Sequence, residues 1–174
     1  KGSTDVPGQA VEGLPFELSL AFHSDAGFHT DNSIYGSLSI STTQNADGNT
    51  VFASGLSRLA SSDFAQLVLR SLTDDLSRTF HINWAQREHW DRNYAETRMP
   101  EVPSAILETM SHQNFGDMRF GHDPLFKFTL ARSVYKSILR YVNYEHGVTN
   151  YVVQPLAPHA FAAQLSPDAS SVRL

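Results

Sequence analysis

Residues 102–110 read VPSAILETM, in which the apolar run Ala105-Ile106-Leu107 lies between Pro103 and Glu108. Apolar residues in succession, without polar alternation, are typical of a strand that is buried on both faces of its sheet. A sheet buried in this way needs helices to cover it. The stretch therefore predicts a buried strand of an α/β domain.

Two segments earlier in the chain predict further strands. In residues 16–23, FELSLAFH, apolar side chains alternate with others, which is the period of a strand, and SDAG at 24–27 ends it. Residues 34–42 are rich in β-branched and small residues, and NADG at 45–48 predicts the turn that follows.

Two segments predict helices. Apolar residues recur at helical spacing over residues 56–76. A second helix is expected to begin with Asp123 as N-cap and Pro124 in its first turn, and to end at Gly147. Its expected buried stripe consists of Leu130, Val134, Ile138 and Val142.

The order strand, strand, helix, strand, helix predicts a three-layer α/β/α sandwich with a mostly parallel or mixed central sheet. Residues 80–98 carry both tryptophans but no clean period, and we interpret them as an irregular surface excursion. Residues 1–150 are assigned to one domain. The Ala-, Ser- and Pro-rich residues 151–174 are interpreted as a linker and the first strand of a following module.

The composition limits the function. A hydrophobic fraction of 41% is enough for a buried core, and the net charge of −5 gives no electrostatic reason to expect a nucleic-acid partner. No apolar stretch has transmembrane length. Because the chain has no cysteine, a bound metal must be held by His, Asp or Glu.

Two predicted strand ends carry candidate functional residues, since ligands of open α/β sheets gather beyond the carboxyl ends of strands. His23 ends the first strand, where a neutral imidazole is a good zinc ligand; a histidine that merely caps the strand is the alternative. Glu108 directly follows the buried run. Dehydration there would raise its pKa and suit a general base, whereas pairing with Arg87, Arg92 or Arg98 would make it structural.

Taken together, these segments resemble the zinc-dependent N-acetylmuramoyl-L-alanine amidases of the AmiC/CwlV type. The segment LAFHSDA at 20–26 is similar to the family's strand that ends in a zinc-binding histidine. The segment PSAILE at 103–108, followed by Asn114 and Asp117, is similar to its catalytic strand. The segments FHSDAG at 22–27, PEVP at 100–103 and SHQNF at 111–115 resemble a branch of large secreted amidase-like proteins from Bacteroides-type bacteria, in which a fibronectin-type module follows the catalytic domain.

The resemblance implies a phosphorylase/hydrolase-like fold and a cell-wall hydrolase that cuts the amide bond between N-acetylmuramic acid and L-alanine in peptidoglycan. It implies His23 as a zinc ligand, Glu108 as the catalytic acid/base, Zn²⁺ as cofactor and an exported location in the periplasm or outside the cell. Two other readings stay open: a non-catalytic module that binds peptidoglycan or another glycan, and a polysaccharide lyase.

The family's two further zinc ligands precede the His23 motif, and no Gly-His-Gly segment occurs in this sequence. We expect that the chain is the C-terminal part of the domain and that its N-terminal part lies upstream or on a separate chain. Alternatively the branch has lost its metal, or His29 and Asp31 substitute. The histidine His112 and the aromatic cluster of Trp84, Trp90 and Tyr94 are further candidates for the cleft, the cluster as cover for the core or as a platform for sugar rings.

Overall fold

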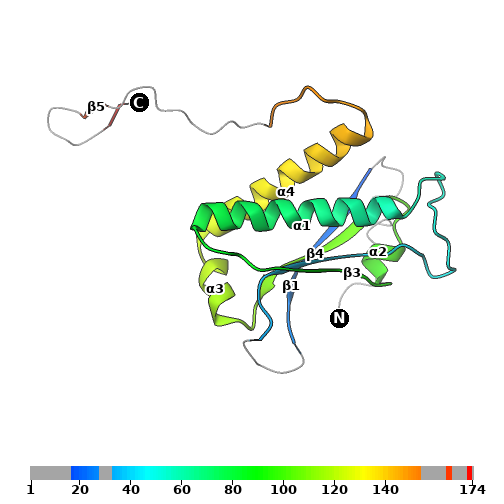
Figure 1. Cartoon of the computed structure of the whole chain (residues 1–174), viewed down its shortest axis with the longest axis horizontal. Helices are drawn as coiled ribbons and strands as arrows, with labels where there is room; N and C mark the ends of the chain where they lie inside the picture. Colours follow the sequence, from blue (N-terminus) through cyan, green and yellow to red (C-terminus); the bar gives the residue numbers. More distant parts are fainter. Residues whose placement is uncertain (1–16, 28–32, 154–163, 166–171, 174) are drawn as a thin grey trace.

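The computed structural model describes residues 17–27, 33–153, 164–165 and 172–173 (Figure 1). A mixed sheet has the strand order β1-β4-β2-β3, in which β1 is parallel to β4, β4 antiparallel to β2 and β2 parallel to β3. Its strands are β1 (Ser19–Asp25), β2 (Ser37–Ser41), β3 (Gln86–Asp91) and β4 (Ser104–Ser111). The helices are α1 (Leu59–Phe80), α2 (Ala95–Arg98), α3 (Phe115–Gly121) and α4 (Pro124–Glu145). The predicted α/β class with a mixed sheet is confirmed.

Strand β4 lies inside the sheet between β1 and β2, as its apolar run predicted. Ala105 and Leu107 point into the main hydrophobic core, which α1 and α4 share. Ile106 points to the opposite face, where it packs with Leu38 and Ile40 of β2. The apolar residues on both faces of this strand are therefore buried. The next residue, Glu108, is partly exposed.

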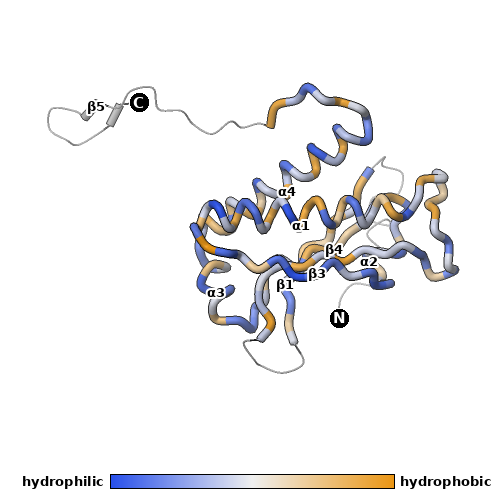
Figure 2. The backbone as a smooth tube through the Cα atoms, viewed as in Figure 1, coloured by the Kyte–Doolittle hydropathy of each residue, from blue (hydrophilic) through white to orange (hydrophobic). Residues whose placement is uncertain are grey.

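The two long helices lie on one face of the sheet (Figure 1). Along α1 hydrophobic and hydrophilic residues alternate at helical period (Figure 2). Its buried positions with the largest apolar side chains are Phe64, Val68, Leu69, Leu72 and Leu76. On α4 one residue of the predicted stripe, Val134, is buried as expected, and the other buried positions differ from the prediction. The fully buried residues there include Ser133 and Ser137, whose small side chains allow close helix packing. Leu130, Ile138 and Val142 are only partly buried.

Local signals set the limits of α4. Asp123 is its N-cap and accepts a hydrogen bond from the backbone N–H of Leu125 at 2.8 Å. After the helix, Gly147 takes a left-handed conformation with φ of 64°, which favours glycine. Both predicted limits are confirmed.

The interpretation of residues 80–98 as an irregular excursion is wrong. This segment contains β3, which pairs with β2, and the short helix α2. Trp84 is 5% exposed and packs against Phe120 and Phe126 in the main core. Strand β3 has no clear strand pattern in its sequence because polar side chains occupy most of its positions. It is the outer strand beside β2 in the described sheet, and its pairing contains a register shift.

Beyond α4, β5 (Gln164–Leu165) pairs with β6 (Val172–Arg173) in an antiparallel sense. Most of residues 151–174 lie outside the described residues, so the domain limit at residue 150 and the following module stay predictions. Among the described residues, no helix is long and apolar enough to cross a membrane.

Candidate functional site

Strands β1 and β4 bring His23 and Glu108 side by side. The two residues are direct partners in the parallel register, and Thr109 donates a hydrogen bond from Oγ1 to the carbonyl of His23 at 3.0 Å. His23 Nδ1 lies 3.7 Å from Glu108 Oε1. The carboxyl ends of both strands lie at this edge of the sheet, where the sequence led us to expect a site.

The segments that follow the two strands are also tied together. The backbone N–H of His112 donates to the carbonyl of Asp25 at 3.1 Å. The His112 ring Nδ1 lies 3.0 Å from Ser24 Oγ, and the N–H of Gly27 donates to Gln113 Oε1 at 2.9 Å. These links fix the backbone beneath His23 and Glu108, and they bring His112 to the same end of the sheet.

The Glu108 carboxyl is mostly withdrawn from water, with 12% of its side chain exposed. Its Oε2 atom is buried and has no hydrogen-bond partner among the described residues. Burial raises the pKa of Glu108 above its ordinary value, while the nearby His23 and Arg87 act in the opposite direction. No arginine pairs with Glu108 among the described residues, because Arg87 forms its ion pair with Asp25. A dehydrated carboxyl that is not neutralised by an arginine is the state expected of a general base.

His23 and Glu108 face a cavity of about 260 Å³ on the side of the sheet opposite α1 and α4. Its remaining lining residues are Asp25, Leu38, Ile40, Trp90, Tyr94, Glu96 and Ile106. The imidazole of His23 is 40% exposed and lies between two carboxylates, because its Nε2 is 3.8 Å from Glu96 Oε1. The cavity therefore joins an apolar floor to a polar wall.

Sequence reasoning missed Glu96 and Asp25 and grouped the aromatic residues incorrectly. Trp90 and Tyr94 line the cavity, whereas Trp84 lies on the opposite face of the sheet in the main core. No signal in the sequence marks Glu96, because it belongs to the segment that we took for an excursion. The alternative ligands His29 and Asp31 lie outside the described residues.

Asp117 of α3 anchors the sheet end next to the site. Its buried Oδ2 accepts hydrogen bonds from the backbone N–H groups of Ser111 and Gly36, both at 2.8 Å. Gly36 has a positive φ of 78°, and a Cβ there would lie 2.3 Å from the carbonyl oxygen of Ala85. The carboxyl thus joins the end of β4 to the start of β2 at a place that only glycine can occupy.

We predict that Asp117→Ala destabilises the fold by roughly 1–3 kcal/mol for each backbone donor that it leaves unpaired. Asp117→Asn keeps an acceptor oxygen and should cost less. Urea unfolding of the two variants and the wild type measures this difference. Equal unfolding midpoints for Asp117→Ala and the wild type would contradict the anchoring role.

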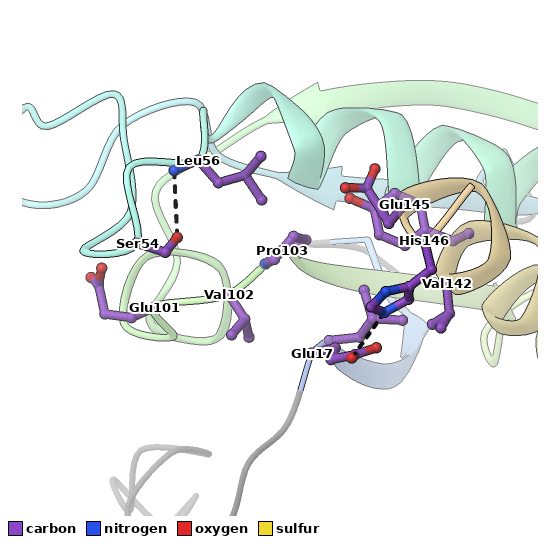
Figure 3. Close-up of a pocket in the computed structure, with 11 residues that line it drawn as sticks. Glu17, Ser54, Leu56, Glu101, Val102, Pro103, Val142, Glu145 and His146 are labelled. Carbon is purple, nitrogen blue, oxygen red and sulfur yellow. Dashed lines mark hydrogen bonds and ion pairs between the residues drawn. The ribbon is translucent and has the colours of Figure 1, made fainter. Parts of the chain in front are cut away.

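A second cavity of about 250 Å³ lies at the other ends of β1 and β4 (Figure 3). Glu17, Glu101 and Glu145 lie around an apolar lining, but Glu17 contacts His146 at 3.1 Å and Glu101 pairs with the buried Arg58 at 2.7 Å. Because its acidic groups Glu17 and Glu101 are already paired and it lies at the amino ends of the strands, we take the His23–Glu108 cavity as the functional site.

Among the described residues, no group of three or more His, Asp or Glu side chains is arranged to hold a metal ion. The two carboxylate neighbours of His23 lie at different nitrogens of its ring, Glu96 Oε1 at 3.8 Å from Nε2 and Glu108 Oε1 at 3.7 Å from Nδ1, so the three groups do not converge on a single point. The site as described is therefore not a complete metal centre.

No protein-family model and no curated protein matches the sequence. The fold, however, is similar to solved amidases. The CwlD amidase from Clostridioides difficile has a TM-score of 0.60 at 14% identity, over 78% of this chain and 59% of that one. The catalytic domain of CwlV, an N-acetylmuramoyl-L-alanine amidase from Bacillus (Paenibacillus) polymyxa var. colistinus, has 0.59 at 16% identity, over 78% and 63%.

A further N-acetylmuramoyl-L-alanine amidase, from Clostridium difficile 630, has a TM-score of 0.58 at 15% identity. The match covers 73% of this chain and 58% of that one, so the chain spans about three fifths of the length of the amidase structures that it matches. The chain has the fold of the N-acetylmuramoyl-L-alanine amidases, as the resemblance in its sequence implied.

Proposed function

We propose that this protein takes part in the hydrolysis of peptidoglycan, at the amide bond between N-acetylmuramic acid and L-alanine. The observation that supports the proposal is the proximity of His23 to a largely buried Glu108, which pairs with no arginine among the described residues, at one end of an amidase-type sheet. Because peptidoglycan lies outside the cytoplasmic membrane, the same proposal implies an exported protein of the cell envelope.

The side chains that face the cavity are of the chemical kinds that bind zinc, although they do not form a complete ligand set among the described residues. Zinc binds imidazole nitrogens and carboxylate oxygens where cysteine is absent, and the cavity has both. The buried Oε2 of Glu108 also lacks a hydrogen-bond partner among the described residues, which a cation or a water molecule would supply. We assign His23 as the residue that would hold zinc. When bound there, zinc supplies polarisation of the scissile carbonyl and a lowered pKa for water.

Glu108 is the general base in this mechanism. Its carboxylate takes a proton from the water that attacks the scissile carbonyl, and it then delivers that proton to the leaving nitrogen. The carbon–nitrogen bond breaks, and the products are the lactyl carboxylic acid and the free amino group of L-alanine. The raised pKa of Glu108 suits both steps. A carboxylate with a higher pKa is a stronger base toward water, and its protonated form can still donate the proton to the leaving nitrogen.

Trp90 and Tyr94 form the aromatic wall of the cavity, beside the apolar floor of Leu38, Ile40 and Ile106. We assign this wall to the apolar face of a sugar ring of the substrate, because aromatic side chains offer flat apolar contact next to a polar group. Trp84 has no part in it, since it is buried in the core.

We infer that the rest of an amidase-type domain packs against β1 and brings further ligands. Among the described elements, β1 is the outer strand of the sheet and pairs only with β4. Beside it, an apolar groove of about 520 Å³ is lined by Leu18, Leu20, Phe22, Phe64, Ala131, Val134, Tyr135 and Ile138. Phe22 in this groove is 53% exposed. A further strand could pair with the open edge of β1, and a further helix could cover the apolar groove beside it.

A non-catalytic peptidoglycan-binding module is the second candidate. The finding that favours it is the lack of a complete metal-ligand set among the described residues. Such a module would use the same cavity and aromatic wall to hold the glycan but would leave the amide bond intact.

The products formed from purified peptidoglycan distinguish these functions. We expect the full-length protein with Zn²⁺ to release peptides with a free L-alanine amino group and to leave the sugar chains intact. Mass spectrometry of the soluble fraction measures both. Binding without new amino groups would support the module, and unsaturated sugars that absorb in the ultraviolet would instead indicate a lyase.

A further inference from the structure

A third cavity, of about 410 Å³, lies beyond the carboxyl end of β4 and is lined by α3 and the residues on either side of it. Its basic lining residues are His112, Arg119 and His122, and none of its lining residues is acidic. The His23–Glu108 cavity and the cavity at the amino ends of β1 and β4 both carry glutamates. The third cavity therefore differs from them in charge and favours an anionic ligand.

Arg119 gives this cavity a permanent positive charge, because a guanidinium stays protonated throughout the physiological range of pH. Its side chain is exposed, and among the described residues ion pairs are formed by Arg58, Arg78 and Arg87 but not by Arg119. The carboxyl of Asp117, two residues before it, is buried and accepts two backbone N–H groups instead. Arg119 is therefore available to bind a carboxylate through two parallel hydrogen bonds.

Phe115 and Met118 supply the apolar part of the lining. Phe115 is 80% exposed, so its ring contributes little to the hydrophobic core. An exposed aromatic ring beside an arginine offers contact to the aliphatic part of a ligand whose carboxylate the arginine binds. A short peptide with a free carboxylate combines both groups.

His112 connects this cavity to the edge of the sheet that carries the proposed catalytic pair. It follows Glu108 by four residues, and its ring Nδ1 lies 3.0 Å from Ser24 Oγ at the end of β1. The aromatic wall of Trp90 and Tyr94 belongs to β3 and the segment after it, on the other side of β4 from β1. A substrate whose sugar ring lies on that wall and whose amide bond lies beside Glu108 therefore extends its peptide toward His112.

We propose that this third cavity binds the anionic peptide stem of the substrate and that Arg119 recognises a carboxylate of the stem. The inference rests on the proposed function, which assigns the scissile amide bond to Glu108. On the leaving side of that bond the stem continues from L-alanine and carries free carboxylates. Arg119 is in this role a residue that determines specificity, and it takes no part in breaking the bond.

Binding of the synthetic stem peptide L-alanyl-γ-D-glutamyl-L-lysine to the full-length protein, measured by isothermal titration calorimetry, tests the proposal. We expect Arg119→Gln to weaken binding by about tenfold or more, the usual contribution of a hydrogen bond to a charged group. Arg119→Lys should lose less, because lysine keeps the charge but not the paired hydrogen bonds. Arg70→Gln, which changes an exposed arginine of α1 outside the cavity, is the matched control and should bind as the wild type does.

The same peptide with both carboxylates converted to amides distinguishes recognition of charge from a structural effect. It should bind the wild type about tenfold more weakly than the unmodified peptide does, and Arg119→Gln should weaken it no further. Equal weakening of both peptides by Arg119→Gln would overturn the assignment, as would unchanged affinity for the unmodified peptide. Failure of the wild type to bind the unmodified peptide would also overturn it. Thermal unfolding of each variant checks that the fold is retained.

Hydrolysis of peptidoglycan separates this inference from the proposed function. If the wild type releases free L-alanine amino groups and Arg119→Gln does so with an unchanged KM, the amidase activity stands and the stem site is wrong. If the stem peptide binds in an Arg119-dependent manner but no amide bond is cut, the stem site stands and the amidase activity is wrong. We expect hydrolysis by both proteins, with KM raised in Arg119→Gln and kcat nearly unchanged.

Discussion

Glu108→Gln is expected to reduce amide hydrolysis by the full-length protein by about 10²–10⁴-fold, the usual contribution of a positioned general base. Glutamine keeps the size of the side chain but cannot take a proton from water. The 12% exposed side chain leaves little room for a solvent molecule to replace the missing base. Release of free L-alanine amino groups from peptidoglycan is the measurement, and Glu145→Gln serves as the control. Activity close to that of the wild type would remove Glu108 from the mechanism.

The same carboxyl should shape the dependence of activity on pH. Because burial raises the pKa of Glu108, its base form becomes dominant only at a pH higher than the ordinary value of 4.5. Hydrolysis should therefore rise with pH through a range above that value. A pH–rate profile of the wild type tests this, and an acidic limb at or below 4.5 would contradict it.

Stability should change in the opposite sense. A folded-state pKa above the unfolded one means that the folded protein binds this proton more tightly, so the free energy of unfolding falls as pH rises through the range between the two values. Glu108→Gln removes that penalty. We expect the variant to be more stable than the wild type at neutral pH, with the difference shrinking toward pH 4. Urea unfolding at both pH values measures it.

Phe64→Ala is expected to cost about 3–5 kcal/mol of folding free energy, the usual range for a buried aromatic residue. Phe64 on α1 is fully buried, and its ring centroid lies 5.0 Å from that of Tyr141 on α4. Its removal would leave a cavity between the two long helices and the sheet. Such a loss is a large part of the stability of a domain of this size.

Phe128→Ala is the matched control, because Phe128 lies on α4 but is 62% exposed. It should change the free energy of unfolding by well under about 1 kcal/mol. Urea unfolding followed by circular dichroism compares the two variants. Similar destabilisation by both would mean that the helix pair is not held by the core that Phe64 occupies.

Local patterns in the sequence predicted much of this fold. Three local patterns were informative because each depends mainly on the residues of its own element: the apolar run before Glu108, the alternation before His23 and the Asp123-Pro124 helix start. They also predicted that His23 and Glu108 belong to one edge of the sheet, because the ends of neighbouring parallel strands meet there. Their chemical roles stay predictions.

Tertiary structure alone decided the remainder. Three features could not be predicted from the hydrophobic pattern of the sequence. They are the pairing of β3 with β2, the location of Trp84 and Trp90 on opposite faces of the sheet, and the contact of Glu96 with His23. An edge strand buries fewer apolar residues than a central strand, so its hydrophobic pattern is weak. A contact between residues far apart in the sequence depends on how the elements pack against one another. The sequence alone thus predicted strands β1, β2 and β4, the long helices α1 and α4, and the two strand ends that carry His23 and Glu108. The sheet order, and with it the carboxylate on the far side of His23, followed only from the packing of the whole domain.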